Sequence, residues 1–417
     1  PIFSQNRENY VTTLAKLFEY ATDNYAKRPL SQFVEGGQEY TFDSFKHKCL
    51  ELSHRFNRFG ISARDKVAIL SNNMPNWTVA MFSCVPFGRV TVPILPDSSE
   101  SEVTNIINHS ECKAIFVSRR LLKKLSQEVI DKLTLVIDIE TFDFIKKDDK
   151  AFTCEGHGVD PQADDLASII YTSGTSGKAK GVMLSHRNFC QNIIAAYHAQ
   201  KAGKHDRWLS ILPMSHTYEM AFSVLYPLYV GGCVYYIQKP PTPSILMQTM
   251  KKVKPTIMCS VPLIIEKVYK SKIQKIVEKG GVKTLLKVPV IDKMIQKKIC
   301  GELVSAFGGE FVEVIMGGAA FNKEIEKFFW DIAFPYTVGY GMTECAPIIT
   351  YAHYDDKKLY SCGKAALNMS IRIDSPDPEN IEGEIQAYGP NLALGYYKNE
   401  EATRSLFTED GWLKTGY

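Results

Sequence analysis

Apolar residues recur with two different periods along the first part of the chain. Residues 41–59 have the helical spacing of apolar side chains and are followed by Gly60, which favours a helix C-terminus. Short apolar runs, typical of strands buried on both faces, alternate with helical patterns. The expected strands are residues 66–70, 90–95, 114–117 and 133–137, and the expected helices are residues 76–87 and 100–109. This alternation indicates parallel strands in a three-layer α/β unit.

A second series follows a stretch of weak pattern. Residues 138–165 are acidic, contain Pro161 and are expected to form a surface connection. Beyond it we predict a strand at residues 166–170 and a helix at residues 186–200, capped by Ser185. Further strands are expected at residues 208–212, 234–237, 256–260 and 312–316. The expected fold class is therefore α/β, with two related three-layer units on mostly parallel sheets, although no sequence repeat is visible.

After Tyr340 the pattern changes to short strands interrupted by Gly and Pro, as at residues 371–373 and 383–390. This pattern of short, interrupted strands is typical of antiparallel sheets. We therefore expect a small, antiparallel, barrel-like β unit over residues 340–417. The paired α/β units are placed in residues 1–339.

One uncharged segment, residues 220–237, is long enough to raise the question of a membrane span. Pro227, the Gly231-Gly232 pair and Ser223 favour a buried helix, a turn and a strand instead. Residues 1–7 lack the charged and then apolar layout of a signal peptide. A cytoplasmic location is the resulting expectation.

Charge and cysteine content exclude several classes of protein. The 49 Lys and Arg against 46 Asp and Glu give a net charge of +3, which is too balanced to indicate nucleic acid as a partner. The ten cysteines are scattered, without a C-x-x-C pair. They are typical of free thiols in a reducing compartment, and not of a disulfide framework or a zinc site.

Residues 171–181, with the sequence YTSGTSGKAKG, combine hydroxyls, glycines and cations in one short loop. Glycines let the backbone approach an anion closely, and Lys178 and Lys180 supply countercharge. A Walker A loop would need four residues between its first glycine and the Gly-Lys pair. Here only Thr175 and Ser176 intervene. A strand and a helix bracket the loop, which favours polyphosphate binding, while a flexible surface loop is the alternative.

A second cluster, residues 339–344, has the sequence GYGMTE. Tyr340 offers an aromatic face for stacking and Thr343 offers a hydroxyl group. The carboxylate of Glu344 is a hard oxygen ligand of the kind that Mg²⁺ prefers. Such a pattern is common by itself, but its occurrence after the loop in one chain favours a nucleotide site.

Together the two clusters resemble those of the adenylate-forming superfamily, which comprises acyl-CoA synthetases, nonribosomal adenylation domains and firefly-type luciferases. The resemblance covers nearly the whole chain. It extends to residues 212–216 (LPMSH), 317–320 (GGAA), 383–384, 389–397 and 409–416 (EDGWLKTG). Residues 260–269, with the long insertion before Phe307, are similar to the long-chain fatty acyl-CoA synthetase branch.

The resemblance implies a role for each matching residue. His216 would border the acyl carboxylate, Tyr340 would stack on adenine and Thr343 would meet the α-phosphate. Glu344 would hold Mg²⁺. The implied catalytic residues are Lys178, His216, Thr343 and Glu344. The implied nucleotide-binding residues are Thr172, Ser173, Gly174, Thr175, Ser176, Gly177, Lys178, Gly317, Gly318, Ala319, Ala320, Tyr340, Gly341 and Thr343.

The implied reaction is acyl adenylation: a carboxylate oxygen attacks the α-phosphorus of ATP, pyrophosphate leaves, and the thiol of coenzyme A then attacks the acyl-AMP. The implied cofactors are ATP, Mg²⁺ and coenzyme A, and the partners are small-molecule substrates. The family places a ribose-binding aspartate where this sequence has Tyr417. We also expect the family's smaller C-terminal lid domain, with its catalytic lysine, to be absent. Two alternatives follow: a catalytically silent ATP- or acyl-binding protein, and a supplier of acyl-adenylate to a carrier-protein thiol.

Residues 251–298 hold thirteen lysines against three acidic residues. A solvated, lysine-rich helical surface is the default interpretation. The alternative is weak, peripheral docking to an anionic membrane.

Overall fold

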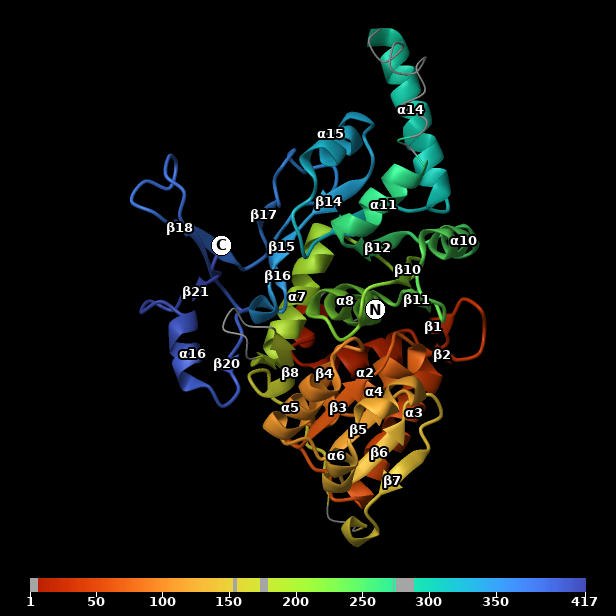
Figure 1. Cartoon of the computed structure of the whole chain (residues 1–417), viewed down its shortest axis with the longest axis vertical. Coiled ribbons are helices and arrows are strands. Elements are labelled where there is room, and N and C mark those ends of the chain that lie inside the picture. Colours follow the sequence, from red (N-terminus) through yellow and green to blue (C-terminus); the bar gives the residue numbers. More distant parts are fainter. Residues whose placement is uncertain (1–6, 153–155, 173–178, 273, 275–288) are drawn as a thin grey trace.

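The computed structural model describes residues 7–152, 156–172, 179–272, 274 and 289–417. Two large sheets form its centre (Figure 1). The first contains β3 (Lys66–Leu70), β4 (Val90–Ile94), β5 (Ala114–Val117), β6 (Leu135–Asp138), β7 (Phe144–Lys147), β8 (Leu166–Thr172), β9 (Lys180–Ser185) and β20 (Gly395–Tyr396). Its strand order is β20-β9-β8-β4-β3-β5-β6-β7, and β8, β4, β3, β5 and β6 are parallel neighbours.

The second sheet contains β1 (Pro29–Phe33), β2 (Glu39–Thr41), β10 (Arg207–Ser210), β11 (Cys233–Tyr236), β12 (Ile257–Ser260), β13 (Glu313–Met316) and β14 (Tyr336–Val338). Its order is β14-β13-β12-β10-β11-β1-β2, and only the β1–β2 pair is antiparallel. Mostly parallel sheets with helices between the strands confirm the predicted α/β class.

Helices cover both sheets, and local sequence explains their ends. In α3 (Phe42–Arg58), the hydroxyl of Thr41 accepts from the N–H of Ser44, whose side chain bonds back to Thr41, and Gly60 follows with a φ of +70°. Ser185 caps the helix that begins at His186 in the same way, as predicted. The other helices are α1 (Arg7–Tyr10), α2 (Leu14–Asn24), α4 (Pro75–Phe82), α5 (Glu100–Ser110), α6 (Gln127–Lys132), α7 (His186–Ala199), α8 (Thr217–Glu219), α9 (Tyr226–Val230), α10 (Pro243–Val253), α11 (Pro262–Lys272), α14 (Pro289–Ala306), α15 (Lys323–Asp331) and α16 (Glu400–Leu406).

Two local predictions were wrong, and one pair of strands was missed. The helix expected at residues 76–87 ends with α4 at Phe82, and a separate 3-10 turn, η1 (Val85–Phe87), contains Pro86, which lacks the N–H that a continuing helix needs. The expected connection at residues 138–165 contains β7, an edge strand paired with β6. The N-terminal strands β1 and β2 were not anticipated.

The segment after residue 339 is antiparallel, as expected. It contains β15 (Tyr340–Gly341), β16 (Ile348–Tyr351), β17 (Lys364–Ala365), β18 (Ser370–Asp374), β19 (Glu384–Tyr388) and β21 (Leu413–Lys414). These strands form two three-stranded sheets. The two sheets do not close into a barrel within the described part of the chain. β20 leaves this segment and pairs with β9 of the first large sheet.

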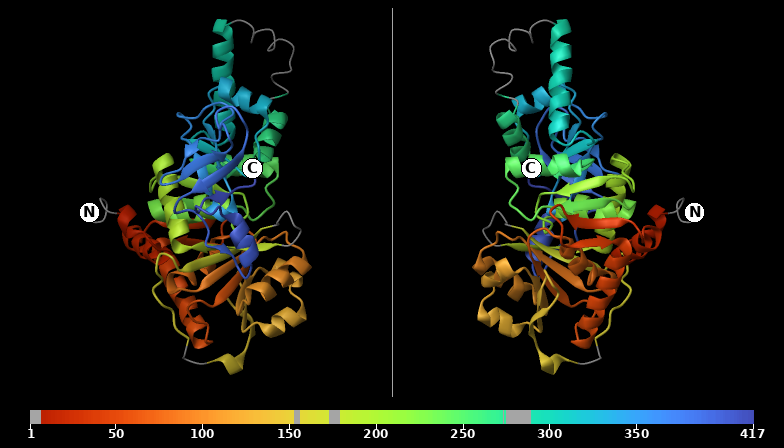
Figure 2. Two further views of the ribbon diagram at one scale, coloured as in Figure 1. Left: turned by 90° about the vertical axis from the view of Figure 1, so that its left-hand side faces the viewer. Right: turned by 90° about the vertical axis from the view of Figure 1, so that its right-hand side faces the viewer.

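The uncharged segment at residues 220–237 is buried, as predicted. It forms a π-helical turn, η4 (Met220–Leu225), then α9, a turn at Gly231 and β11. Within the described residues, we find no helix that combines the length and the apolar character needed to cross a bilayer. Unlike this buried segment, α14 extends away from the body of the molecule (Figures 1 and 2).

Candidate active site

The predicted site residues meet where the parallel strands of both sheets have their carboxyl ends. β8 ends at Thr172, β10 leads to His216, and β13 leads to Gly317. Ligands of open α/β sheets bind at this edge. A cleft of about 1150 Å³ opens here. Its lining includes Thr172, Lys180, His216, Gly318, Gly341, Met342, Thr343, Glu344, Glu384, Tyr396, Glu401, Thr415, Gly416 and Tyr417.

The predicted phosphate loop lies only partly within the described residues. Its central positions, Ser173, Gly174, Thr175, Ser176, Gly177 and Lys178, lie outside them. The hairpin that carries the loop is described, because Thr172 ends β8 and Lys180 begins β9, and the two residues are cross-strand partners. Both side chains line the cleft. The two described ends of the loop, Thr172 and Lys180, therefore both lie at the cleft.

Glu344 is buried on the cleft wall, in the 3-10 turn η5 (Thr343–Cys345). Its Oε1 accepts a hydrogen bond of 2.7 Å from the hydroxyl of Tyr396. The ammonium of Lys180 lies 5.2 Å from the centre of the Tyr396 ring. No described residue donates a hydrogen bond to the other carboxylate oxygen. A single oriented carboxylate in a phosphate cleft fits Mg²⁺, which proteins often bind through one or two carboxylates together with substrate phosphates.

Tyr340 and Gly341 form the strand that precedes Glu344. Tyr340 is half-buried, and its ring lies edge-on to that of Tyr417, with centroids 6.1 Å apart at 83°. A Cβ on Gly341 would lie 2.0 Å from the carbonyl oxygen of Pro347, so only glycine fits there. Tyr417, at the position where the resemblance leads us to expect an aspartate, lines the cleft and is 76% exposed. A tyrosine hydroxyl cannot accept two hydrogen bonds as a carboxylate does.

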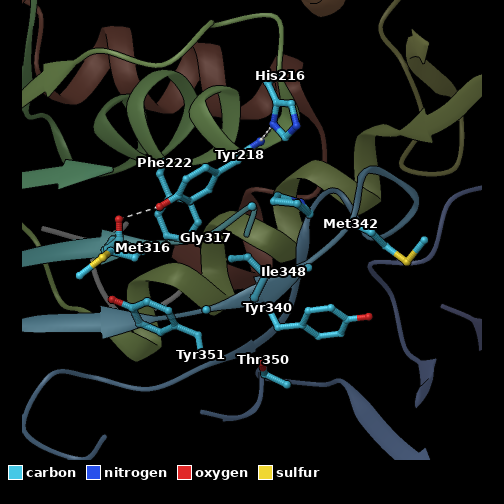
Figure 3. Close-up of a pocket in the computed structure, with 15 residues that line it drawn as sticks. His216, Tyr218, Phe222, Met316, Gly317, Tyr340, Met342, Ile348, Thr350 and Tyr351 are labelled. Carbon is cyan, nitrogen blue, oxygen red and sulfur yellow. Dashed lines mark hydrogen bonds between the residues drawn. The ribbon is translucent and has the colours of Figure 1, made fainter. Parts of the chain in front are cut away.

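His216 borders three cavities at once: the cleft, a small apolar cavity and a third cavity on the side of the first sheet. Its Nδ1 accepts a hydrogen bond of 3.2 Å from the backbone N–H of Tyr218 (Figure 3). Burial lowers the pKa of His216. The neutral ring therefore carries its proton on Nε2, because Nδ1 is an acceptor. His216 can donate a hydrogen bond to a carboxylate without being charged.

The apolar cavity has a volume of about 60 Å³. Its walls come from the end of β13, from α8 and η4, and from β15 and β16 (Figure 3). They include His216, Tyr218, Phe222, Met316, Gly317, Gly318, Tyr340, Ile348, Thr350 and Tyr351. The Tyr218 hydroxyl donates to the carbonyl of Ile315 at 2.8 Å, and a Cβ on Gly317 would lie 3.4 Å from the Tyr218 ring. Since one water needs about 10–15 Å³ of such volume, the cavity has the room of roughly four to six waters.

The third cavity, of about 170 Å³, reaches His216 and Thr343 from the first sheet. Its walls come from the ends of β4 and β8 and from α5. They include Pro93, Ile94, Leu95, Ser98, Ile106, Ile170, Tyr171, Thr172 and Ser215. The cleft, the apolar cavity and this third cavity therefore meet at one histidine.

Two buried carboxyl groups lie behind the apolar cavity. Glu219 is fully buried, its Oε1 accepts from the Ser210 hydroxyl at 2.8 Å, and burial raises its pKa to about 7. Glu313 accepts a hydrogen bond from the Tyr351 hydroxyl, and burial raises its pKa to about 8. Both are neutral in acidic solution, which removes the cost of burying a charge beside an apolar site.

The sequence motifs indicate some of these residues and miss others. Gly317 and Gly318 line the cavities as expected, whereas Ala319 and Ala320 are exposed just beyond them. Tyr396 was part of a glycine-rich motif, but its contact with Glu344 was not predicted. Tyr218 and Glu219 follow His216 by two and three residues, yet nothing in their spacing showed that one lines a cavity and that burial raises the pKa of the other.

The mostly parallel sheets, with Glu344 and His216 placed at the strand ends, agree with the family resemblance that the motifs indicated. A profile of the AMP-binding enzyme family matches residues 18–397. The chain belongs to that family, which confirms the resemblance seen in its motifs.

Relatives and solved structures agree with this assignment. The chain is 28% identical to the peroxisomal long chain acyl-CoA synthetase 6 of Arabidopsis thaliana, over 86% of this chain and 56% of that protein. It is 29% identical to the long-chain-fatty-acid–CoA ligase FadD15 of Mycobacterium bovis, over 86% and 63%. It thus spans less than two thirds of either relative. The inhibitor-bound N-terminal domain of FACL13 from Mycobacterium tuberculosis has a similar fold, with a TM-score of 0.78, 19% identity and coverage of 97% and 95%.

Proposed function

We propose that this chain uses ATP and Mg²⁺ to activate a carboxylic acid as its acyl-AMP. The observation that carries the proposal is the convergence of Thr172, His216, Thr343 and Glu344 on one cleft at the strand ends. Membership of the AMP-binding enzyme family supports it.

In the proposed reaction a carboxylate oxygen bonds to the α-phosphorus of ATP while the bond from that phosphorus to the leaving pyrophosphate breaks. The Nε2–H of His216 would hold the carboxylate, and the hydroxyls of Thr172 and Thr343 would hold phosphate oxygens, together with Lys178 from the loop. Mg²⁺ at Glu344 would supply charge neutralisation when bound. Holding the attacking and leaving groups in line is the main contribution of such a site.

Acid-dependent exchange of pyrophosphate into ATP tests this proposal directly. The exchange requires formation and reversal of the acyl-AMP, so an active enzyme shows label in ATP only when acid and Mg²⁺ are both present. Nucleotide binding without exchange would favour the silent ATP- or acyl-binding protein instead.

For the acid we propose a fatty acid of the long-chain class, because both named relatives are long-chain enzymes and the cavity beside His216 is apolar. At about 60 Å³ the cavity is too small for a long chain while Tyr218 stays bonded to Ile315. A long chain therefore requires the Tyr218 side chain to move.

This geometry predicts how acid affinity depends on chain length. In the wild type, affinity should rise by about 0.8 kcal/mol per buried methylene until the cavity is filled, and then more slowly. In Tyr218→Ala, the affinity should continue to rise for longer acids. Tyr197→Ala removes a ring near the C-terminal end of α7 and should leave the dependence on chain length unchanged. A series from acetate to palmitate, measured as KM in the exchange assay, checks this. The same profile in Tyr218→Ala and the wild type would exclude Tyr218 as the limit.

For the acceptor we propose the thiol of coenzyme A. The third cavity supports this choice, because it gives a path to His216 and Thr343 that the cleft and the apolar cavity do not occupy. A carrier-protein thiol would need the same path. Competition between coenzyme A and a phosphopantetheine-bearing carrier, in a preparation of this chain that makes acyl-AMP, distinguishes the two.

A cytoplasmic location stays a prediction.

We also propose weak docking to anionic membranes through α14, which extends from the body and carries exposed Lys293, Met294, Lys297 and Lys298. Lysines near an anionic surface contribute about 1 kcal/mol each, within a Debye length of about 8 Å at physiological salt. The chain should cosediment with anionic vesicles at low salt and dissociate as salt rises.

The matched variants for this prediction replace three lysines by glutamine. Changing Lys293, Lys297 and Lys298 should remove the salt-sensitive binding, whereas changing Lys123, Lys132 and Lys150 on the first α/β unit should not. Equal binding to neutral vesicles, or no binding to anionic ones at low salt, would contradict the proposal and favour a solvated surface.

A further inference from the structure

The segment that carries His216, between β10 and α8, is held by a side chain from the other sheet. Asn73, in the loop after β3, donates from Nδ2 to the Ser210 hydroxyl at 3.1 Å and to the Leu212 carbonyl at 2.6 Å. Its Oδ1 accepts from the backbone N–H of Met214 at 3.0 Å. Both hydrogens of the amide group and its oxygen therefore bond to three alternate residues within one five-residue stretch.

The same segment is held on its other side by Glu219. The Ser210 hydroxyl, which accepts from Asn73, donates to Oε1 of Glu219 at 2.8 Å. Glu219 comes three residues after His216 and closes the short helix α8. A continuous chain of hydrogen bonds thus runs from the first sheet, through Asn73 and Ser210, to the helix turn behind His216.

Resting on the function proposed above, we propose that Asn73 and Glu219 are positioning residues for His216. Together, through Ser210, they fix the segment so that the Nε2–H of His216 faces the acid. The imidazole itself is held by only one bond in the described structure, from the N–H of Tyr218. Its place therefore depends on the backbone of residues 210–219, and the hydrogen-bond chain fixes that backbone at both ends.

Isosteric substitutions separate this role from general stability. In Asn73→Asp the shape is kept, but an oxygen without hydrogens replaces Nδ2 and faces the Leu212 carbonyl, so two donors are lost. Glu219→Gln keeps the shape and an acceptor for Ser210 without a charge, whereas Glu219→Leu keeps bulk without an acceptor. Asn72→Ala is the control. Asn72 is next to Asn73 in the chain, but its side chain bonds to Arg120 and not to the His216 segment.

The first readout is the exchange assay, with acid and ATP varied separately. A misplacement of about 1 Å in such a site can cost on the order of 100-fold in rate. Asn73→Asp and Glu219→Leu should lower kcat/KM for the acid by about 10-fold or more, with the KM for ATP nearly unchanged. Glu219→Gln and Asn72→Ala should stay near the wild type. Equal losses for acid and ATP, or an unaffected Asn73→Asp, would overturn the proposal.

The second readout does not require activity. The ring nitrogens of His216 can be followed by NMR after selective histidine labelling, with His216→Asn to assign the signals. Asn73→Asp and Glu219→Leu should shift the His216 resonances, and Asn72→Ala should leave them in place. If the wild type shows no exchange, the adenylation proposal fails while this test still decides whether Asn73 and Glu219 position the ring. Unchanged resonances in both variants would refute the positioning role.

Discussion

Glu344→Gln should lower magnesium-dependent pyrophosphate exchange by about 100-fold or more, because loss of a metal ligand beside the phosphates removes several kcal/mol of transition-state stabilisation. The amide keeps an oxygen that can accept from Tyr396, so the local hydrogen bond at 2.7 Å can be retained. The charge that would hold the metal is lost. The rate should be measured across a Mg²⁺ titration at saturating ATP and acid.

Glu401→Gln is the matched control for this prediction. Glu401 lines the same cleft, lies exposed on α16 and has the same charge and size. Its replacement should leave both the rate and the Mg²⁺ dependence close to the wild type. If Glu344→Gln retained the wild-type Mg²⁺ dependence, the metal would be held elsewhere and the assignment of Glu344 would be wrong.

Strands of the large sheets could be predicted from sequence because parallel strands are buried on both faces and appear as uninterrupted apolar runs. β3 and β5 have the predicted bounds. β10 ends at Ser210, two residues before the predicted end. The apolar run continues to Leu212, but the Leu212 carbonyl bonds to Asn73 instead of joining the ladder. An apolar pattern reports burial, and it does not report which polar group satisfies the backbone.

β1 and β2 could not be predicted for a different reason. β1 is an interior strand that pairs with β11 across about two hundred residues of sequence, and β2 is three residues long and largely exposed. Neither the partner nor the register of such strands follows from a local pattern. Only the packed structure shows that the N-terminal segment completes the second sheet.

In the candidate site, too, the sequence indicates some residues and only the structure reveals the others. The glycines, hydroxyls and carboxylate of the two motifs could be identified as candidates from the sequence, because such groups together are typical of sites for phosphate and metal. The residues that orient them lie far away in sequence: Tyr396 is 52 residues from Glu344, and Asn73 is 141 residues from Met214. Tyrosine and asparagine are also common outside sites, so their types alone carried no signal.

The buried acids Glu219 and Glu313 should make the protein less stable as the pH rises. Each has a pKa raised from 4.5, to about 7 and about 8 respectively, because burial disfavours the carboxylate. Between the unfolded and the folded pKa, the folded protein holds a proton that the unfolded chain has released. The free energy of unfolding therefore falls with pH, by about 1.4 kcal/mol per unit for each group. The fall begins near pH 4.5 and is complete above pH 7 for Glu219 and above pH 8 for Glu313.

Glu219→Gln and Glu313→Gln should each flatten this dependence, since glutamine stays neutral and keeps a hydrogen-bond acceptor for Ser210 or Tyr351. Urea unfolding at pH 5, 6, 7 and 8 should show the wild-type midpoint falling more steeply than that of either variant. Glu324→Gln, on the exposed surface of α15, should follow the wild type. Parallel curves for all four proteins would mean that the two carboxyl groups do not keep their protons in the folded state. The neutral environment assigned to the back of the apolar cavity would then be wrong.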